Sequence, residues 1–505
     1  MIARRLVISG ALAAVMMAPG LRLRADSLPD AAPPSLLEAA RALAATPYTP
    51  GTGMLPPPFA GLSYDAYRGI RPIPGRAAIL PHGPRFAVDL LPPGLFFPDP
   101  VTVDLPADGG FAPVPLTPDL FDFDARYFDA IPDTAPGAGF SGLRLRHPLN
   151  APDLLDEVLV VQGASYFRAI GQAMVYGLSA RAVALGTGGA APEEFPRFTH
   201  LRLHPAQGDA VRLEAVIDSP SLAGHLDMVL RPGLDTVMEV AVTILTRREI
   251  ADIGVAPLTS MYLKGPMRAA VSDDFRPRVH DSDVLVIDNG AGETLWRPIA
   301  NPARVETSVF VDDGPAGFGL WQTPRDFEDF EDSEARYHDR PSAYVEALTD
   351  WGRGGVVLVE IPTGDEFMDN IVAFWRPEAP LAAGSEHRFA YRLTWTRAAP
   401  FAGHALPVRQ SRSGREHDRP GTRRFVVDFA GTGEELGVDL SASAGVVSGA
   451  SLFALPEGRG TRVTFLLAPE GVDLADLRLV LRDGGGVAVS PVWIYRWTRA
   501  RDGGV

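Results

Sequence analysis

Two clusters of acidic residues are the part of this chain best suited to chemistry. The first is His280-Asp281-Ser282-Asp283, just before the apolar run Val284–Ile287. The second is Asp365-Glu366-Phe367-Met368-Asp369-Asn370, just before Ile371–Trp375. Hydrolysis of a glycosidic bond needs two carboxyl groups in different environments, one to protonate the leaving oxygen and one to activate water. Acidic residues at strand ends are also common as solvated turn formers, so the residues alone leave both interpretations open.

A run of aromatic, glycine and arginine residues at Gln162–Arg181 (QGASYFRAIGQAMVYGLSAR) suggests a binding surface. Glycine lets the backbone come close to a ligand. Tyr166 offers a flat ring and Arg168 a forked donor. This mixture favours a cleft wall for a polyhydroxylated substrate.

Composition and charge exclude several classes of function. The chain has 505 residues and a formal charge of −15, which argues against nucleic acid and against an anionic membrane surface as partners. There is no cysteine, so thiol nucleophiles, cysteine–zinc sites and disulfides are excluded. The ten histidines show no HExxH spacing, and we expect no metal and no cofactor. A neutral sugar ligand is compatible with all of this.

The elements that must position these residues are mostly strands. The 51 glycines and 47 prolines suit short strands and turns rather than long helices. Short alternating or apolar segments predict antiparallel strands, among them 200–204, 211–217, 237–246 and 356–361. One helix is predicted over about Leu36–Ala45, where Ser35 and Glu38 form a capping box. The expected fold class is therefore all-β.

The domain organisation is predicted from a lapse in this pattern. Residues 397–420 are rich in proline, glycine and mixed charge, which indicates a linker between a large domain at 26–396 and a small one at 421–505. The small domain has the size of an antiparallel sandwich, with strand-like pieces at 424–429, 461–467, 477–481 and 492–497.

The first 25 residues read as an export signal. Arg4 and Arg5 precede an apolar run from about Leu6 to Ala18 that is too short to span a bilayer. The arginine pair favours the twin-arginine route to the periplasm, and no membrane span is expected in the mature chain.

Ordered sequence blocks resemble a known family. They are the run from Gln162 together with EEFPRF (193–198), GVAPLTSM (254–261), HDSD (280–283), WRPIANP (296–302), GFGL (317–320), RPSAYVE (340–346), EIPT (360–363) and DNIVAFW (369–375). In this order they resemble the periplasmic glucan biosynthesis proteins, the OpgG/OpgD (MdoG/MdoD) family. The resemblance implies a large galactose-mutarotase-like β-sandwich followed by an immunoglobulin-like β-sandwich. It also implies action on β-1,2-glucan during synthesis of osmoregulated periplasmic glucans.

The resemblance assigns roles to individual residues. The general acid of the family's inverting glucanases falls on Asp369 and the general base on Asp281, with protons relayed through water and a substrate hydroxyl. Glu366 shares the loop of the acid and would hold such a relay, and Tyr337 matches a cleft tyrosine. Because sugar rings stack on aromatic faces, we also expect Tyr166 and Trp296 to contact glucan, together with Arg168.

Three functions remain open at this point. The first is an inverting β-1,2-glucanase or transglycosylase. The second is a non-catalytic glucan-binding partner of the inner-membrane glucan synthase, because some family members keep the same aspartates and show little activity. The third is an aldose-epimerase-like role by fold analogy alone, which the lack of a convincing pair of catalytic histidines counts against.

Overall fold

The structure is a computed structural model that describes residues 35–51, 53–56, 58–80, 85–108, 110–130, 139–267, 273–398 and 404–502. The predicted export signal at 1–25 lies outside these residues. The chain from Ser35 onward forms one compact unit. No helix within the described ranges has the length and apolar character needed to cross a membrane.

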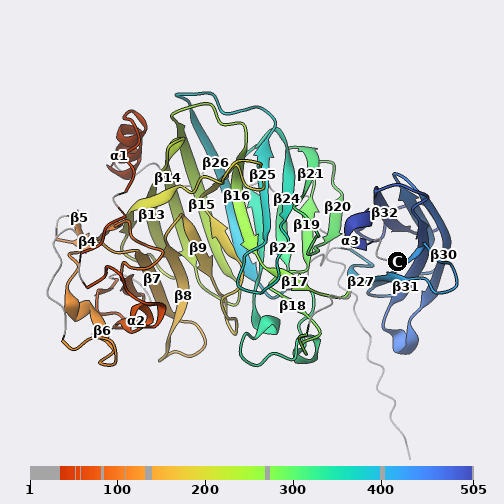
Figure 1. The fold of residues 1–505 in the computed structure, drawn as a ribbon, viewed down its shortest axis with the longest axis horizontal. Coiled ribbons are helices and arrows are strands. Elements are labelled where there is room, and N and C mark those ends of the chain that lie inside the picture. Colours follow the sequence, from red (N-terminus) through yellow and green to blue (C-terminus); the bar gives the residue numbers. More distant parts are fainter. Residues whose placement is uncertain are drawn as a thin grey trace, which may run out of the picture. The chain divides into compact units, whose positions relative to one another are not determined.

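The fold is all-β, as predicted, and is dominated by two large sheets (Figure 1). The first has eleven strands. In spatial order they are β2 (Ala78–Ile79), β3 (Ala87–Leu91), β7 (Gly142–Pro148), β8 (Leu155–Gln162), β9 (Tyr166–Ala169), β10 (Ser179–Arg181), β16 (Ile253–Ser260), β25 (Ile371–Pro377), β24 (Arg353–Glu360) and β21 (Glu306–Asp313), with β11 (Val183–Leu185) also paired to β16.

The second sheet has fourteen strands and runs into the C-terminal part of the chain. Its order is β29 (Gly437–Ala442), β32 (Leu474–Arg482), β33 (Val492–Thr498), β20 (Thr294–Pro298), β19 (Val284–Asp288), β22 (Gly317–Trp321), β23 (Ser342–Ala347), β26 (Glu386–Thr396), β15 (Thr236–Thr246), β14 (Leu222–Arg231), β13 (Val211–Asp218), β12 (Arg197–Leu203), β4 (Thr102–Ala107) and β5 (Gly110–Pro113).

The remaining elements are smaller. Three further sheets pair β1 (Ile70–Pro72) with β6 (Phe121–Phe123), β17 (Tyr262–Lys264) with β18 (Val279–His280), and β27 (Val408–Arg415), β28 (Arg423–Phe429), β31 (Thr461–Ala468) and β30 (Val446–Ala454) in that order. The helices are α1 (Ser35–Ala44), α2 (Tyr64–Arg68) and α3 (Arg499–Asp502), and 3-10 turns lie at η2 (Pro118–Leu120), η3 (Phe327–Asp329), η4 (Tyr337–Asp339) and η5 (Pro456–Gly458). The predicted helix and the strands named from the sequence are confirmed within a few residues at each end.

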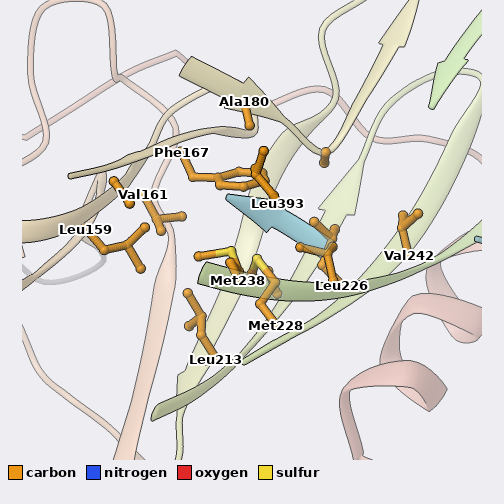
Figure 2. Close-up of a cluster of buried hydrophobic side chains, with 14 of the residues drawn as sticks. Leu159, Val161, Phe167, Ala180, Leu213, Leu226, Met228, Met238, Val242 and Leu393 are labelled. Atoms are coloured by element: carbon orange, nitrogen blue, oxygen red, sulfur yellow. The ribbon is translucent and has the colours of Figure 1, made fainter. Parts of the chain in front are cut away.

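The core lies between the two large sheets. Figure 2 shows Leu159, Val161, Phe167 and Ala180 of the eleven-stranded sheet against residues of the fourteen-stranded sheet, among them Leu213, Leu226, Met228, Met238 and Leu393. Side chains alternate between the faces of a strand, so each strand of this layer sends every second residue into the core. In β9 this places Phe167 and Ala169 inside and leaves Tyr166 and Arg168 on the other face.

The last strands, drawn in blue in Figure 1, pack as a second layered region. Strand β33 pairs with β20 in parallel, so that Trp296 lies opposite Trp493, and these strands share a core with the sheet β27-β28-β31-β30. Strand β27 occupies part of the stretch expected to be a linker at 397–420. The division of the chain into two domains at this stretch stays a prediction, as does an immunoglobulin-like topology for the second.

Candidate functional site

The HDSD segment leads into a strand of the fourteen-stranded sheet and lies beside the end of a strand of the eleven-stranded sheet. Strand β16 ends at Ser260, and β19 begins directly after Asp283. The backbone N–H of Asp281 donates to the carbonyl of Met261 at 2.8 Å. The hydroxyls of Ser282 and Ser260 are hydrogen-bonded at 2.6 Å. These links fix Asp281 beside the end of β16, where the residue is only 4% exposed.

Arg340 holds the carboxylate of Asp281. Its Nη1 lies 2.5 Å from Asp281 Oδ1, and its Nε donates to the carbonyl of Ala335. The guanidinium also lies over the ring of Tyr337, 4.2 Å from the centroid, in a cation–π contact. Gly177 makes room for this arrangement, because a Cβ there would lie 2.9 Å from the Cβ of Arg340.

The surroundings of Asp281 change its acidity. Burial raises the pKa of Asp281 above its ordinary value, although the nearby Arg340 opposes the rise. The like charge of Asp369 raises this pKa further, and Arg168 lowers it. The charges of Asp369 and Arg168 thus act on Asp281, although each acts less strongly than burial and Arg340. A carboxyl group with a raised pKa is a better general base than an ordinary aspartate.

Asp369 lies in a loop that is held at its end by hydrogen bonds of the neighbouring Asn370. Asn370 is fully buried, where its Oδ1 accepts from the N–H of Tyr262 at 2.8 Å and its Nδ2 donates to the carbonyls of Tyr262 and Ile361. Within the loop, the N–H of Phe367 donates to Asp365 Oδ1 at 2.9 Å. The amide of Asn370 therefore anchors the loop while Asp369 stays exposed to solvent.

Glu366, in the same loop, contacts Tyr337, and the part of either residue in a relay stays a prediction. The hydroxyl of Tyr337 donates to Glu366 Oε2 at 2.7 Å, and Arg276 Nη1 donates to the same oxygen at 2.7 Å. Arg276 also contacts Asp332 at 2.8 Å. Burial, followed by the hydrogen bond to Glu366, raises the pKa of Tyr337, so this phenol stays protonated. The chain of contacts runs from Asp281 through Arg340 and Tyr337 to Glu366.

Tyr166 and Arg168 lie on the same face of β9, directed away from the core. The ring of Tyr166 is covered by the guanidinium of Arg181, 4.9 Å from its centroid. Burial raises the pKa of the Tyr166 hydroxyl, and the charges of Arg181, Asp369 and Arg168 also act on it. A role of Tyr166 and Arg168 in glucan binding stays a prediction.

The structure does not bring Trp296 to this site. Its ring is 1% exposed and packs with Trp493 and other residues of the C-terminal strands. Phe167, which belongs to the same aromatic run as Tyr166, is likewise buried and has an edge-on contact with Trp395. Neither ring has a face that a glucan can reach.

Three supporting residues had no assigned role in the sequence analysis. Arg340, Arg276 and Asn370 hold Asp281, Glu366 and the Asp369 loop, respectively. Arg340 begins the RPSAYVE block, Arg276 lies four residues before HDSD, and Asn370 is the second residue of DNIVAFW. Their presence in or beside matched blocks was the available signal, but their partners lie too far away in the sequence to be read from it.

Buried His280 predicts a pH dependence of stability. Burial lowers its pKa from 6.5 to about 4, so the unfolded chain binds a proton over this range that the folded chain does not. The stability that comes from neutral His280 is complete above pH 6.5 and is lost as the pH falls toward 4. About 3 kcal/mol of unfolding free energy is at stake.

The measurement is urea denaturation at pH 7 and at pH 4.5 for wild type and His280→Gln, which cannot titrate. We expect the variant to be less stable at pH 7 and to lose less stability on acidification. Equal losses in the two proteins would show that His280 is not held neutral.

Comparison with known proteins places the chain among glucan biosynthesis proteins. A family model described as "Periplasmic glucan biosynthesis protein, MdoG" matches residues 33–497. The chain is 40% identical over 474 residues to Glucans biosynthesis protein G of Vibrio cholerae, covering 92% of this chain and 86% of that protein. It is 39% identical over 472 residues to the protein of the same name from Shewanella frigidimarina, covering 92% and 84%.

Among solved structures, a polysaccharide lyase matches 70% of this chain and 44% of its own length, with 11% identity and a TM-score of 0.20. The family match extends from residue 33 to residue 497 and so takes in every residue of the site described above. The chain therefore belongs to the family of periplasmic glucan biosynthesis proteins, MdoG.

Proposed function

We propose that this protein is a periplasmic enzyme that hydrolyses or transfers β-1,2-glucan with inversion during periplasmic glucan synthesis. The observation that supports the proposal is the contrast between Asp281, which is buried and paired with Arg340, and Asp369, which is exposed on its loop. Two carboxyl groups in contrasting environments can divide the acid and base roles.

The proposed step can be written with these two groups. Asp369 gives its proton to the glycosidic oxygen as the bond from the anomeric carbon to that oxygen breaks. A water molecule attacks the same carbon from the opposite face, and its proton passes to Asp281. In a transfer reaction, a hydroxyl of a second glucan takes the place of the water.

The burial of Asp281 favours inversion. Its carboxylate is held by Arg340 and almost excluded from solvent, so it is poorly placed to attack an anomeric carbon directly. A base in this position receives its proton through intervening groups. The hydrogen bond from Tyr337 to Glu366, which lies in the loop of Asp369, supports a relay that includes Glu366.

Exposed aromatic rings support contact with a glucan. Phe367 is 90% exposed on the loop that carries Asp369, and Phe195 is 47% exposed beside the guanidinium of Arg181, which also covers Tyr166. Exposed rings near carboxylates suit the apolar C–H faces of sugars. The same rings would serve a non-catalytic glucan-binding partner of the membrane glucan synthase, which is the second candidate function.

Turnover separates the two candidates. Purified mature protein is incubated with linear β-1,2-glucan, and the products and the anomeric configuration of the first-formed reducing ends are followed by NMR. Linear β-1,3-glucan is the control substrate. Products with inverted configuration from β-1,2-glucan, with no products from β-1,3-glucan, support the enzyme function. Binding of β-1,2-glucan without any product supports the binding partner.

Export of this chain is part of the proposal and rests on Arg4 and Arg5 together with the family's description as periplasmic. Replacing both arginines by lysine tests the twin-arginine route. An unchanged periplasmic yield would indicate another route.

Adjacent residues of β9 give a matched test of glucan binding. Tyr166→Ala removes a ring on the site face, so we expect weaker binding of β-1,2-glucan and a nearly unchanged thermal midpoint. Phe167→Ala removes a buried ring and should cost about 3–5 kcal/mol of unfolding free energy. Calorimetric titration and denaturation of both variants check this. Full affinity in Tyr166→Ala would remove Tyr166 from the binding surface.

A further inference from the structure

Gln322 is the first residue after β22, and its side chain contacts the backbone of two segments that carry candidate site residues. Its side chain is 1% exposed, between the HDSD segment and the 3-10 turn that begins at Tyr337. Its backbone N–H donates to the hydroxyl of Ser342 at 3.1 Å. Nothing in the proposed chemistry uses this amide directly.

Every polar group of the Gln322 side chain is occupied. Its Nε2 donates to the carbonyl of His280 at 2.8 Å and to the carbonyl of Tyr337 at 3.1 Å. Its Oε1 lies 2.6 Å from His280 Nδ1. Because carbonyl oxygens can only accept hydrogen bonds, the amide can face both of them only with its nitrogen. Its oxygen then accepts from His280, which must carry its proton on Nδ1.

The two carbonyls belong to the two segments that form the site. The His280 carbonyl is part of the peptide bond to Asp281. The Tyr337 carbonyl also accepts from the backbone N–H of Arg340 at 3.1 Å. One amide therefore ties the backbone of Asp281 to the turn that supplies Arg340 and Tyr337, across 42 and 15 residues of sequence.

We propose that Gln322 is a positioning residue that fixes Asp281 relative to Arg340 and Tyr337. An effect of Gln322 on catalysis rests on the proposed function. Its effect on the position of Asp281 can be measured whether or not the protein is an enzyme. No residue without both an amide donor pair and an acceptor can satisfy two carbonyls and the His280 N–H at once. Removing the amide loosens the Asp281–Arg340 pair.

Gln322→Met tests this, because methionine keeps the length of the side chain and loses its polar groups. We expect kcat on β-1,2-glucan to fall by about 10- to 100-fold, since small misplacements of catalytic groups have effects of this size. KM should change little. Arg340 holds down the pKa of Asp281, so a looser pair should move the acid limb of the pH–rate profile to higher pH.

Ser490→Ala is the control for a merely structural loss. Ser490 is buried in the C-terminal strands and accepts from the N–H of Leu481 at 2.9 Å, far along the chain from the site. At a temperature where both variants are folded, Ser490→Ala should keep the kcat and the pH profile of wild type. Combining Gln322→Met with Asp281→Asn should lower kcat no further than Asp281→Asn alone.

A measurement without turnover separates this inference from the proposed function. The titration of Asp281 is followed by NMR of protein labelled at the aspartate carboxyl carbons, with Asp281→Asn identifying the signal. A higher pKa of Asp281 in Gln322→Met supports the positioning role, even if wild type has no activity. Absence of activity in wild type would contradict only the proposed glucanase function. An unchanged pKa, or wild-type kcat in Gln322→Met, overturns the positioning role.

Discussion

We expect Asp369→Asn to lower kcat on β-1,2-glucan by about 10²–10⁴-fold, while fold and glucan affinity persist. The amide has nearly the shape of the carboxyl group but has no proton to give to the leaving oxygen. Asp369 is exposed, and no hydrogen bond to its carboxylate is found within the described part of the chain, so stability should not depend on its charge. Steady-state kinetics with calorimetric binding check the prediction.

The same loop supplies the control. Asp365→Asn changes an exposed carboxylate four residues earlier, and the amide oxygen can still accept from the N–H of Phe367. This variant should keep most of its activity. If the two variants lose activity equally, the loop matters for its charge or shape, and Asp369 is not the acid.

The leaving group gives a second check. An aryl β-1,2-glucoside with a very acidic phenol needs no protonation to depart. Asp369→Asn should therefore recover much of the wild-type rate on such a substrate. No recovery on the activated substrate would argue against a proton-donating role.

The strands and their faces could be predicted because each depends on neighbouring residues. Alternation predicts β12 and β13, whereas the alternation in β9, which separates Tyr166 and Arg168 from Phe167, appears only in the structure. Alternation does not say whether a tryptophan near a strand end meets solvent or another layer. Trp296 is buried because β33 pairs with β20, a contact between residues almost two hundred positions apart.

The supporting contacts of the site could not be predicted for the same reason. Asp281 and Arg340 are 59 residues apart, and Glu366 and Arg276 are 90 residues apart. An arginine in a polar stretch looks the same in sequence whether it is solvated or holds a catalytic carboxylate. Only the folded structure distinguishes these two kinds of arginine, because the burial of the side chain and the identity of its partner decide which kind it is.

Asp281→Asn is expected to separate activity from stability. The amide cannot accept a proton from water, so kcat on β-1,2-glucan should fall by about 10²–10⁴-fold. The amide oxygen can still accept the hydrogen bond of Arg340, which keeps 20% of its side chain exposed and so does not become a fully buried, unpaired cation. Loss of the ion pair alone is therefore not expected to unfold the protein.

The raised pKa of Asp281 gives the sign of the stability effect. The folded chain holds the proton of Asp281 more tightly than the unfolded chain, whose aspartate has a pKa of 3.8. Whatever stability the protonated form supplies is complete below that value and is lost as the pH rises through the folded pKa. Wild type therefore carries a cost for an ionised, buried carboxylate at neutral pH that the asparagine variant does not.

Denaturation of wild type and Asp281→Asn at pH 4 and pH 7 measures this cost. We expect the stability of the variant, relative to wild type, to be higher at pH 7 than at pH 4. A gain in stability that accompanies a loss of turnover is typical of a group kept in an unfavourable environment for its chemistry. A variant that is several kcal/mol less stable at pH 7 would instead show that the pair with Arg340 outweighs burial, and Asp281 would then be a structural residue rather than the base.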